Sequence, residues 1–489
     1  MIFMNGKISD SVNYKMAIRL MDKRITRTLS GEKLDPERVI NAAGRMAEDA
    51  MSGKFDREFA RYLQPGGSQP GKEPLSFHDG LSAAMAELFR ADSLRKKFQL
   101  ELSGFPDSSA EGKRFRRLPI GVLLHIAAGN AEGLPAYSVL EGLLAGNINI
   151  LKLPAGDDGL SLFILKKLTE YEPVLKEYIY VMDTPSGDEK TMKMMMRLAG
   201  GIAVWGSDET ILAVRRSAPA NVKLIEWGHR LSFAYIDDLD APEEKLGALA
   251  RHIFSTKQLL CSSCQVIYLN TVDFEDVKKF GRRFAKIMKR EEGTEGNSPF
   301  IQGKVTVELM TRRLERVSRK GCRASEKTQV NRASGKMQAS RASGKAQVNR
   351  ASGKTQACRK MEQAPSCCVY RAGSGSVICM DDNKLEVSGQ FGNVLVKPLP
   401  REQIITALYS SKRHLQTVGM YPESRELGRL FEQCGLTSLC GLENMSEFEI
   451  TGSHDGTFAL REYTRIAEYK NKITETGLDA SAKGQSAKG

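Results

Sequence analysis

The sequence lacks any long, uninterrupted apolar run. Its most apolar region, residues 118–153, is broken by Glu132, Glu141 and several Gly and Asn residues, so it holds no stretch of about 18 apolar residues of the kind that crosses a bilayer. The opening residues, MIFMNGKISDSVNYK, turn polar after four positions, unlike a secretory signal peptide. We therefore expect a soluble, cytoplasmic protein with no membrane span.

Cysteine is also scarce, with nine residues in a chain of 489. An odd number, without the spacing of a small disulfide-bonded scaffold, favours a reducing compartment. With 41% apolar residues the chain is able to bury large cores, and its length predicts two or three domains.

Acidic residues are outnumbered by basic ones, and the formal net charge is +13 at pH 7. About half of the excess lies in residues 323–358, where a nine-residue unit occurs four times as RASEKTQVN, RASGKMQAS, RASGKAQVN and RASGKTQAC. This segment holds four Arg, four Lys and one Glu, a net charge of +7, and almost no large apolar side chain. Such a composition does not offset the entropy lost on ordering, so we expect a disordered loop and no specific nucleic-acid site. A role in binding anionic partners remains the alternative, and salt-dependent binding would reveal it.

The nucleotide-binding fingerprint G-x-G-x-x-G is absent, yet strand and helix signals alternate as in a nucleotide-binding domain. Strands are predicted at residues 118–128, 147–153, 178–182, 201–206 and 221–227, with helices at 135–146, 158–171, 191–200 and after Ser207. Near-continuous apolar strands in repeated βα units indicate a parallel sheet covered on both faces, as in a Rossmann-type domain. Residues 12–100, which precede it, are predicted to be mainly helical.

A second α/β pattern begins at residue 265. Strands are predicted at 265–270, 375–380, 393–399 and 415–421, and helices at 272–290, 305–319 and 401–411. The junction between the two patterns is the kind of place where clefts form and ligands bind.

Two cysteines, Cys261 and Cys264, stand in the stretch STKQLLCSSCQV just before the first strand of the second pattern. A C-x-x-C pair is compatible with a redox dithiol, half of a zinc site, or one nucleophile beside a small core residue. Zinc would require a second C-x-x-C or suitably spaced His, and the adjacent Cys367 and Cys368 have the wrong spacing. The helix of a small βαβ unit, which a thioredoxin-like dithiol normally opens, is also missing. We therefore expect no metal site and favour a single nucleophile.

Several short segments, taken together and in order, resemble the aldehyde dehydrogenase superfamily. The closest resemblance is to its acyl-CoA reductase branch, that of the reductase component of bacterial bioluminescence fatty acid reductase. The segments are AAGNAEGLP, GLLAGNINILKLP, WGSDET, LIEWGHRLS, KQLLCSSCQ, LQTVGMY and SHDGTFALREYTRIAE. They span residues 118–469, nearly the whole chain apart from the helical front and the repeat. Each motif is weak by itself, whereas their shared order and spacing are specific.

The resemblance implies a fold of class α/β, with a Rossmann-type cofactor domain, a second α/β catalytic domain and a small bridging or oligomerisation element. We place the helical front and the dinucleotide-binding domain in residues 1–228. The catalytic domain, with the repeat as an insert, then occupies 229–445, and the bridging segment and tail occupy 446–489. Homo-oligomers are also implied.

The same resemblance implies a catalytic set. Cys261 matches the nucleophile, Glu226 the residue that transfers a proton, and Asn130 the side chain that donates a hydrogen bond to the oxyanion. A thiolate suits an acyl thioester because it is a soft nucleophile that is partly ionised near neutral pH, and the negative charge that forms on the carbonyl oxygen needs fixed donors.

The implied cofactor-binding residues are Lys152, for the adenosine ribose, and Gly206 and Ser207, which open a helix near the pyrophosphate. Relatives that prefer NAD have a Glu three residues after this Lys, where the present chain has Ala155. The missing carboxylate removes repulsion against a 2′-phosphate, so we expect NADPH, with NADH as the alternative. Two departures from the family pattern are Gly389, where an E-x-F-G motif has Glu, and His229, where a Gly is usual.

The function implied is NAD(P)H-dependent reduction of an acyl-CoA thioester, with a fatty acyl group expected, to the aldehyde through an acyl-cysteine. The donor is an acyl-CoA or an acylated partner protein. An alternative enzyme is an aldehyde dehydrogenase that oxidises an aldehyde to an acid or an acyl-CoA. The alternative outside enzymes is a basic binding protein on a retained scaffold.

Overall fold

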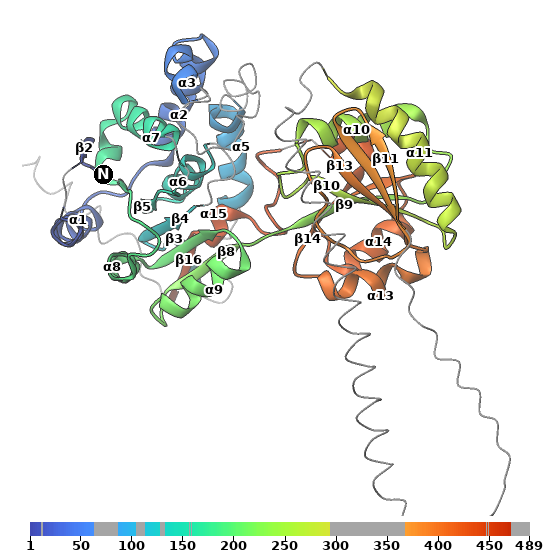
Figure 1. Ribbon diagram of the computed structural model, residues 1–489. Helices are drawn as coiled ribbons and strands as arrows, with labels where there is room; N and C mark the ends of the chain where they lie inside the picture. The colour runs from blue at the N-terminus through green and yellow to red at the C-terminus, as the bar shows by residue number, and fades with distance from the viewer. Residues whose placement is uncertain are drawn as a thin grey trace, which may run out of the picture. The chain divides into compact units, whose positions relative to one another are not determined.

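The computed structural model (Figure 1) describes residues 1–10, 13–62, 87–103, 113–127, 133–155, 157, 159–293, 367–445, 447 and 449–470. Asn130, the helix predicted at 305–319 and the repeat at 323–358 lie outside these residues. The chain divides into two compact units, one made of Met1–Arg230 and Glu447–Gly489 and the other of Leu231–Ser446. None of the helices in the described ranges combines the length and the apolar character needed to cross a bilayer.

The first unit is built on a seven-stranded sheet in the order β2-β1-β6-β5-β4-β7-β8. Its central strands are parallel: β4 (Val122–Ile126), β5 (Ile148–Lys152), β6 (Ile179–Met182), β7 (Gly201–Trp205) and β8 (Lys223–Trp227). β4 to β6 are buried along their whole length and β7 nearly so, and this burial explains their largely apolar sequences. The order in which β5 and β6 lie on one side of β4, and β7 and β8 on the other, is the Rossmann-type winding.

A short antiparallel hairpin, β1 (Ile2–Met4) and β2 (Lys7–Ser9), extends this sheet beyond β6. The sequence analysis did not predict it. Phe3 is fully buried against the first unit's core, whereas β2 is exposed throughout. Three-residue strands give too short a period for the alternation to be recognised in the sequence.

Helices cover the sheet of the first unit (Figure 1). They are α1 (Tyr14–Leu29), α2 (Pro36–Met51), α3 (Asp56–Tyr62), α5 (Ala91–Leu102), α6 (Leu134–Leu144), α7 (Leu160–Tyr171), α8 (Glu189–Leu198), α9 (Asp208–Ser217) and α15 (Ala459–Glu462), with a 3₁₀ turn, η1, at Pro173–Glu177. Asn13 and Asp35 cap α1 and α2 by accepting hydrogen bonds from backbone N–H groups. The helical front predicted from the sequence is therefore confirmed where it is described.

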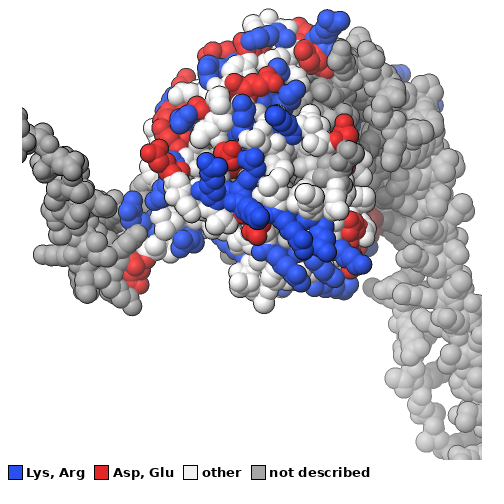
Figure 2. Space-filling view, turned by 90° about the vertical axis from the view of Figure 1, so that its left-hand side faces the viewer, with Lys and Arg blue, Asp and Glu red and all other residues white. Residues whose placement is uncertain are grey.

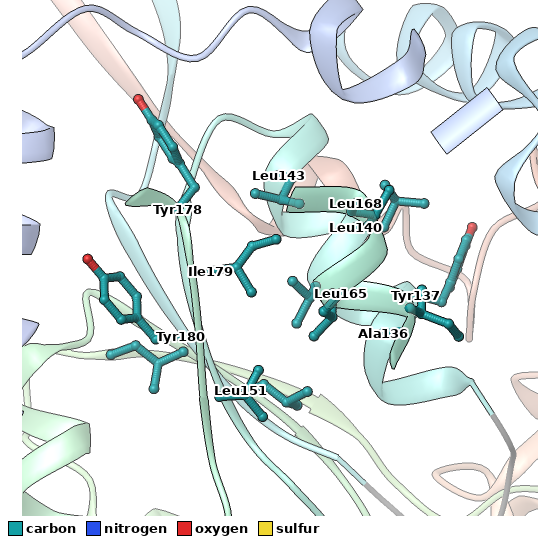
Figure 3. Packing of buried hydrophobic residues seen from close by; sticks show 14 of the residues in the cluster. Ala136, Tyr137, Leu140, Leu143, Leu151, Leu165, Leu168, Tyr178, Ile179 and Tyr180 are labelled. Carbon is teal, nitrogen blue, oxygen red and sulfur yellow. The ribbon is translucent and has the colours of Figure 1, made fainter. Parts of the chain in front are cut away.

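Apolar side chains of α6, α7 and β6 form the centre of this unit. Figure 3 shows Leu140 and Leu143 of α6, Leu165 of α7 and Ile179 of β6 in this cluster, and each is fully buried. Burying such a side chain contributes about 1.5–3 kcal/mol to the free energy of unfolding. The core thus fixes helices α6 and α7 against the strands of the sheet.

One predicted strand, 118–128, is wrong as a single element. The chain forms β3 (Lys113–Pro119), turns at Gly121 with φ +116°, and then enters β4. β3 leaves the large sheet and pairs antiparallel with β16 (Thr464–Lys470) from the end of the chain. Gly121 permits this turn because a side chain at that φ would be strained, so one apolar run serves two sheets.

A buried ion cluster joins α5 and α6. The Lys97 ammonium lies 2.6 Å from Glu101 Oε1 and 3.2 Å from Glu141 Oε1, and all three side chains are at most 5% exposed. Burial raises the pKa of Glu141 to about 7, against the attraction of Lys97. Glu101 also accepts a hydrogen bond from the backbone N–H of Leu460 (2.8 Å). Glu141, which interrupts the most apolar segment of the sequence, is therefore paired with Lys97 inside the protein, as a buried charge must be.

The second unit has its own seven-stranded sheet, in the order β11-β12-β13-β10-β9-β14-β15. All neighbours are parallel except β11 and β12. The strands are β9 (Leu231–Ile236), β10 (Cys264–Leu269), β11 (Cys367–Ala372), β12 (Gly375–Met380), β13 (Asn393–Pro398), β14 (Leu415–Tyr421) and β15 (Ser438–Gly441).

Its helices are α10 (Glu243–Ser255), α11 (Phe274–Glu291), α13 (Ile404–Leu408) and α14 (Arg425–Cys434), with 3₁₀ turns η2 (Arg401–Gln403), η3 (Tyr409–Ser411) and η4 (Leu442–Asn444). The helix predicted at 401–411 is thus three short helical pieces. Strand β9 and helix α10 were not predicted, although β9 lies between β10 and β14 in the middle of the sheet.

Candidate active site

The proposed cofactor residues lie at the carboxyl ends of neighbouring strands in the first unit. Ile126, the last residue of β4, pairs with Lys152 of β5 on one side and with Val204 of β7 on the other. Gly206 and Ser207 follow β7 directly. Strand order reverses at β4, and ligands of open α/β sheets bind at the carboxyl edge of such a reversal. The topology therefore brings together residues that are 54 positions apart, Lys152 and Gly206.

Lys152 is held in a mostly buried position, 4% exposed, where its Nζ donates a hydrogen bond to Ser186 Oγ (3.0 Å). Burial lowers the pKa of this ammonium, and the attraction of Asp183 opposes the shift. Thr184, close to the end of β6, has a buried Oγ1 with no hydrogen-bond partner among the described residues. Polar groups thus gather at the ends of β5 and β6.

Helix α9 begins directly after Gly206 and Ser207. The Gly206 N–H donates to the Trp227 carbonyl (3.2 Å), which fixes the turn against β8, and the side chain of Ser207 makes no capping bond to the helix. The N–H groups at the start of a helix suit a phosphate in general. Asp208 and Glu209 occupy the first turn, and the hydrogen bond from Ser207 lowers the pKa of Glu209. These two carboxylates compete with any anion at this helix end.

The segment after Lys152 carries one carboxylate that is used locally. Ala155 is exposed, whereas Asp157 Oδ1 accepts a hydrogen bond from the Gly159 N–H (2.8 Å) at the start of α7. Asp157 therefore shapes the turn into the helix. Ala155 leaves position 155 without a charge beside the end of β5.

Cys261 and Cys264 occupy contrasting environments in the second unit. Cys264 is the first residue of β10, is fully buried, and donates its S–H to the Val266 carbonyl (3.4 Å). Burial raises the pKa of the Cys264 thiol to about 12. Cys261 lies in the preceding turn, is partly exposed, and neither cysteine is in a disulfide. Of these two cysteines, only Cys261 is accessible, as a nucleophilic thiol must be.

The loop that presents Cys261 is held by buried amides and an imidazole. Gln258, 1% exposed, donates from Nε2 to the Cys264 carbonyl (2.8 Å), and its Oε1 accepts from the Gly392 N–H (3.1 Å). The His252 Nε2 accepts from the Cys264 N–H (3.2 Å), and burial lowers the pKa of His252 to about 4, so the ring is neutral and able to accept. The Ser232 hydroxyl donates to the carbonyl of Cys261 itself (2.7 Å).

This support was missed in the sequence, although Gln258 stood in the motif that located Cys261. Lys257 and Gln258 both have positive φ, +46° and +59°, as do Gln390 and Phe391 in the loop opposite. The Phe391 N–H donates to the Lys257 carbonyl (2.9 Å). Non-glycine residues with a positive φ have a strained backbone, and this conformation persists where neighbouring contacts hold it. Phe391 and Gly392, which match the Phe-Gly part of the E-x-F-G motif, are thus hydrogen-bonded to the loop that carries Cys261.

Glu226 lies on β8 in the first unit, paired in register with Val204 of β7. Its carboxylate accepts two hydrogen bonds from Arg215 of α9: Nε to Oε1 and Nη2 to Oε2, both at 2.5 Å. The neighbouring Trp227 projects to the other face of the strand. There its ring contacts Trp205 and His454, with centroid distances of 5.4 and 4.9 Å. The closing motif SHDG therefore places His454 beside the strand ends that carry Gly206.

No group of three or more His, Cys, Asp or Glu in the described ranges is arranged to hold a metal ion. A groove of about 470 Å³ lies elsewhere in the first unit, between the β1–β2 hairpin and α1, and includes Met4, Met16, Leu20, Arg19 and Lys23. Figure 2 views the side of the molecule that carries α1 and shows Lys and Arg side chains gathered there. None of the proposed catalytic or cofactor residues lines this groove.

Comparison with solved structures identifies the fold. The chain superposes on PnpE from Pseudomonas sp. WBC-3 with a TM-score of 0.65 at 15% identity, covering 96% of this chain and 97% of that one. It superposes on aldehyde dehydrogenase 21 from Physcomitrella patens with a TM-score of 0.63 at 13% identity, covering 97% and 98%. The expected α/β, aldehyde dehydrogenase-like fold is confirmed, with a sheet of Rossmann type in one unit and a second α/β unit.

Curated relatives are long-chain acyl-protein thioester reductases. The Vibrio harveyi protein is 24% identical over 166 residues, which cover 33% of this chain and 35% of that protein. The Photorhabdus luminescens protein is 27% identical over 168 residues, which cover 33% and 35%. The matched region thus spans about a third of the length of these relatives.

The family pattern described as "Acyl-CoA reductase (LuxC)" matches a much larger part of the chain, residues 32–296 and 343–466. The interruption, 297–342, contains the first half of the nine-residue repeat. Both the motif that contains Cys261 and the strand ends described above fall inside the match. Because the match extends over well more than half of the sequence, the chain belongs to the acyl-CoA reductase (LuxC) family.

Proposed function

We propose that this protein reduces an acyl thioester to the aldehyde through an acyl-enzyme on Cys261. The observation that carries the proposal is the contrast between the two cysteines: Cys261 is accessible in a braced loop, whereas Cys264 is buried with a raised pKa. A thioester acceptor must be a thiolate that the substrate is able to reach. Family membership supports the same reaction.

In the proposed cycle the Cys261 thiolate attacks the thioester carbonyl, the carbon–sulfur bond to the donor breaks, and the donor leaves as a thiolate that takes up a proton. Asn130 and the backbone N–H of Cys261 donate to the oxygen that becomes negative. A nicotinamide cofactor, when bound, supplies the hydride that converts the acyl carbon to the aldehyde oxidation level. Release of the aldehyde regenerates the Cys261 thiolate, and Glu226 assists the proton transfers.

The fold and the family imply a nicotinamide cofactor, and we infer that it is NADPH. Lys152 places a buried cation at the carboxyl end of β5, and Ala155 stands at the position where a Glu would repel a 2′-phosphate. Gly206 and Ser207 would receive the pyrophosphate at the start of α9. On this assignment the first unit binds the cofactor and the second carries the thiol.

We infer a long-chain acyl donor, either acyl-CoA or an acylated protein, because the named relatives act on long-chain acyl-protein thioesters. The cytoplasmic location and the homo-oligomeric state expected from the sequence remain part of this proposal.

The test is NADPH oxidation and aldehyde formation with acyl-CoAs of graded chain length and with an acylated protein donor. We expect aldehyde in proportion to NADPH consumed, and a rate that rises with chain length. Oxidation of aldehydes to acids without any reduction of thioesters would identify the alternative, a dehydrogenase. Absence of both activities in a folded protein that binds NADPH would refute the proposal.

A further inference from the structure

The groove of about 470 Å³ between the β1–β2 hairpin and helix α1 has an apolar floor that is open to solvent. Its apolar residues include Met4 of β1, and Met16 and Leu20 of α1. Met16 is 74% exposed and Leu20 is 46% exposed. These two residues are four positions apart, so their side chains lie on one face of the helix. Helix α1 thus presents apolar surface on the side that faces away from the core.

Both walls of the groove are fixed by the core of the first unit. On its inner face α1 buries Ile18 and Met21, and β1 buries Phe3 and pairs with β6 of the large sheet. The hairpin turns at Asn5 and Gly6, whose φ values of +53° and +73° are those that a tight two-residue turn requires. Because the two walls are ordered beforehand, a partner that enters the groove does not lose affinity to the ordering of these elements.

Three cations line the groove, namely Lys7 of β2 and Arg19 and Lys23 of α1. All three are exposed, and none of them forms an ion pair with a carboxylate in the part of the chain that the structure describes. Figure 2 shows Lys and Arg side chains gathered on the side of the molecule that carries α1. The groove therefore combines apolar surface with positive charge that no internal ion pair neutralises.

We propose that this groove docks an acidic amphipathic helix of a partner protein. Apolar side chains spaced three and four residues apart on that helix contact Met16 and Leu20, and Asp or Glu residues beside them pair with the three cations. Met16 and Lys23 are about 10 Å apart along α1, which is about two helical turns, so a short helix covers the groove. The inference goes beyond the proposed function and does not depend on Cys261.

Charge and shape favour this partner over three other occupants. A second copy of the chain in a two-fold contact brings the same cations to the interface, and the repeat at 323–358 carries a net charge of +7, so the groove repels both. An anionic bilayer is attracted by the charge, but its flat surface does not fill a groove. The lining residues also include none of the Trp or Phe side chains that anchor interfacial helices.

The experiment titrates the full-length chain into a fluorescent peptide of about 15 residues, with Leu at helical spacing and Glu on either side, and measures anisotropy. A scrambled peptide of the same composition is the control for helical spacing. R19E/K23E should weaken binding about tenfold, because one exposed charge pair changes a binding constant by up to about fivefold and two pairs are reversed. M16Q should weaken it several-fold through the loss of an apolar contact.

A matched control is K286E/K289E, which reverses two cations on α11. Both are exposed and have no ion pair within the described ranges, so this variant changes the net charge by the same amount as R19E/K23E. It should bind the peptide as the unchanged protein does. Equal weakening in the two double variants, or equal binding of the scrambled peptide, would overturn the inference, since attraction would then follow net charge alone.

Two further measurements identify the other occupants. The unchanged protein is mixed with vesicles of phosphatidylcholine and phosphatidylserine, and its self-association is followed by sedimentation velocity. Vesicle binding or self-association that R19E/K23E abolishes, without binding of the peptide, would overturn the inference in favour of a bilayer or a second copy. Thermal unfolding checks that each variant is folded. Reduction of acyl-CoA is measured separately, so a failure of the proposed function leaves the docking result intact.

Discussion

Replacing Cys261 and Cys264 one at a time is the sharpest test of the nucleophile, because the structure predicts a large difference between two thiols only three residues apart. With a pKa of about 12, roughly 3 in 100,000 Cys264 side chains are thiolate at pH 7.5, whereas about 10% of an ordinary thiol is ionised. The rate of acyl transfer follows the thiolate population. The thiolate fraction of Cys264 should therefore be about 3,000-fold smaller than that of an ordinary thiol. Its burial lowers its reactivity further, because a substrate does not reach it.

The assay is labelling with radioactive acyl-CoA without NADPH, followed by location of the label. Trypsin cleaves after Lys257 and Lys278, so both cysteines lie in one peptide, residues 258–278, and fragment ions must place the acyl group on one side or the other of Ser262 and Ser263. We expect the unchanged protein to carry the label on Cys261. Cys261→Ser should lose the label, whereas Cys264→Ser should keep most of it. The exposed Cys367 lies in another peptide and serves as a control for non-specific acylation.

Two results would refute this reasoning. Acyl groups on Cys264 in the unchanged protein would mean that its burial is not maintained in solution. Equal loss of label in both variants, with both folded, would indicate that the two thiols act together as a dithiol.

Four further outcomes are expected. Ala155→Glu should reduce the preference for NADPH over NADH by about 1–3 kcal/mol as measured by the ratio of kcat/KM values, and an unchanged protein that already prefers NADH would contradict the assignment. Burial raises the pKa of Glu141 from 4.5 to about 7, so between pH 4.5 and pH 7 the native state binds more protons than the unfolded state. The free energy of unfolding should therefore fall by about 3 kcal/mol as the pH rises from 4.5 to 7. Urea unfolding should show this fall in the unchanged protein and not in Glu141→Gln. A Cβ at Gly281 would lie 2.2 Å from Cys379 Sγ, so Gly281→Ala should cost about 1–3 kcal/mol in urea unfolding, whereas Gly428→Ala, whose Cβ would meet its nearest neighbour at 3.7 Å, should stabilise by up to about 1 kcal/mol. Replacing residues 323–358 by a short linker removes a net charge of +7 and should weaken retention on a polyanionic resin while thioester reduction survives; a folded variant that binds NADPH but no longer reduces thioesters would show that the repeat takes part.

Residue type and periodicity alone predict the α/β class and most of the parallel strands. β6 and β7 are buried almost throughout, so each reads as a short, nearly continuous apolar run, and β5 departs from this only at Asn149 and Lys152. Ordered motifs around these runs likewise indicated the family, and the position of Cys261 came from the motif that contains it.

Sequence reasoning missed the elements whose character depends on a distant partner. β9 lies only three residues beyond the end of β8, yet it pairs with β10 and β14 in the other sheet, and nothing in the run itself shows where one sheet ends and the next begins. The division of residues 118–126 between β3 and β4 has the same cause, since β3 pairs with β16 from the opposite end of the chain.

Only the tertiary structure decided what the candidate residues are able to do. Two cysteines with similar neighbours in sequence differ in accessibility because one is the first residue of a central strand and the other lies in the turn before it. Glu226 faces Arg215 because helix α9 folds back along β8, and Gln258 in the loop that carries Cys261 is held by a backbone N–H 134 residues away. Burial, pairing and the direction of a hydrogen bond are set by residues far apart in the chain, so composition and spacing determine which side chains are present, and packing determines their chemistry.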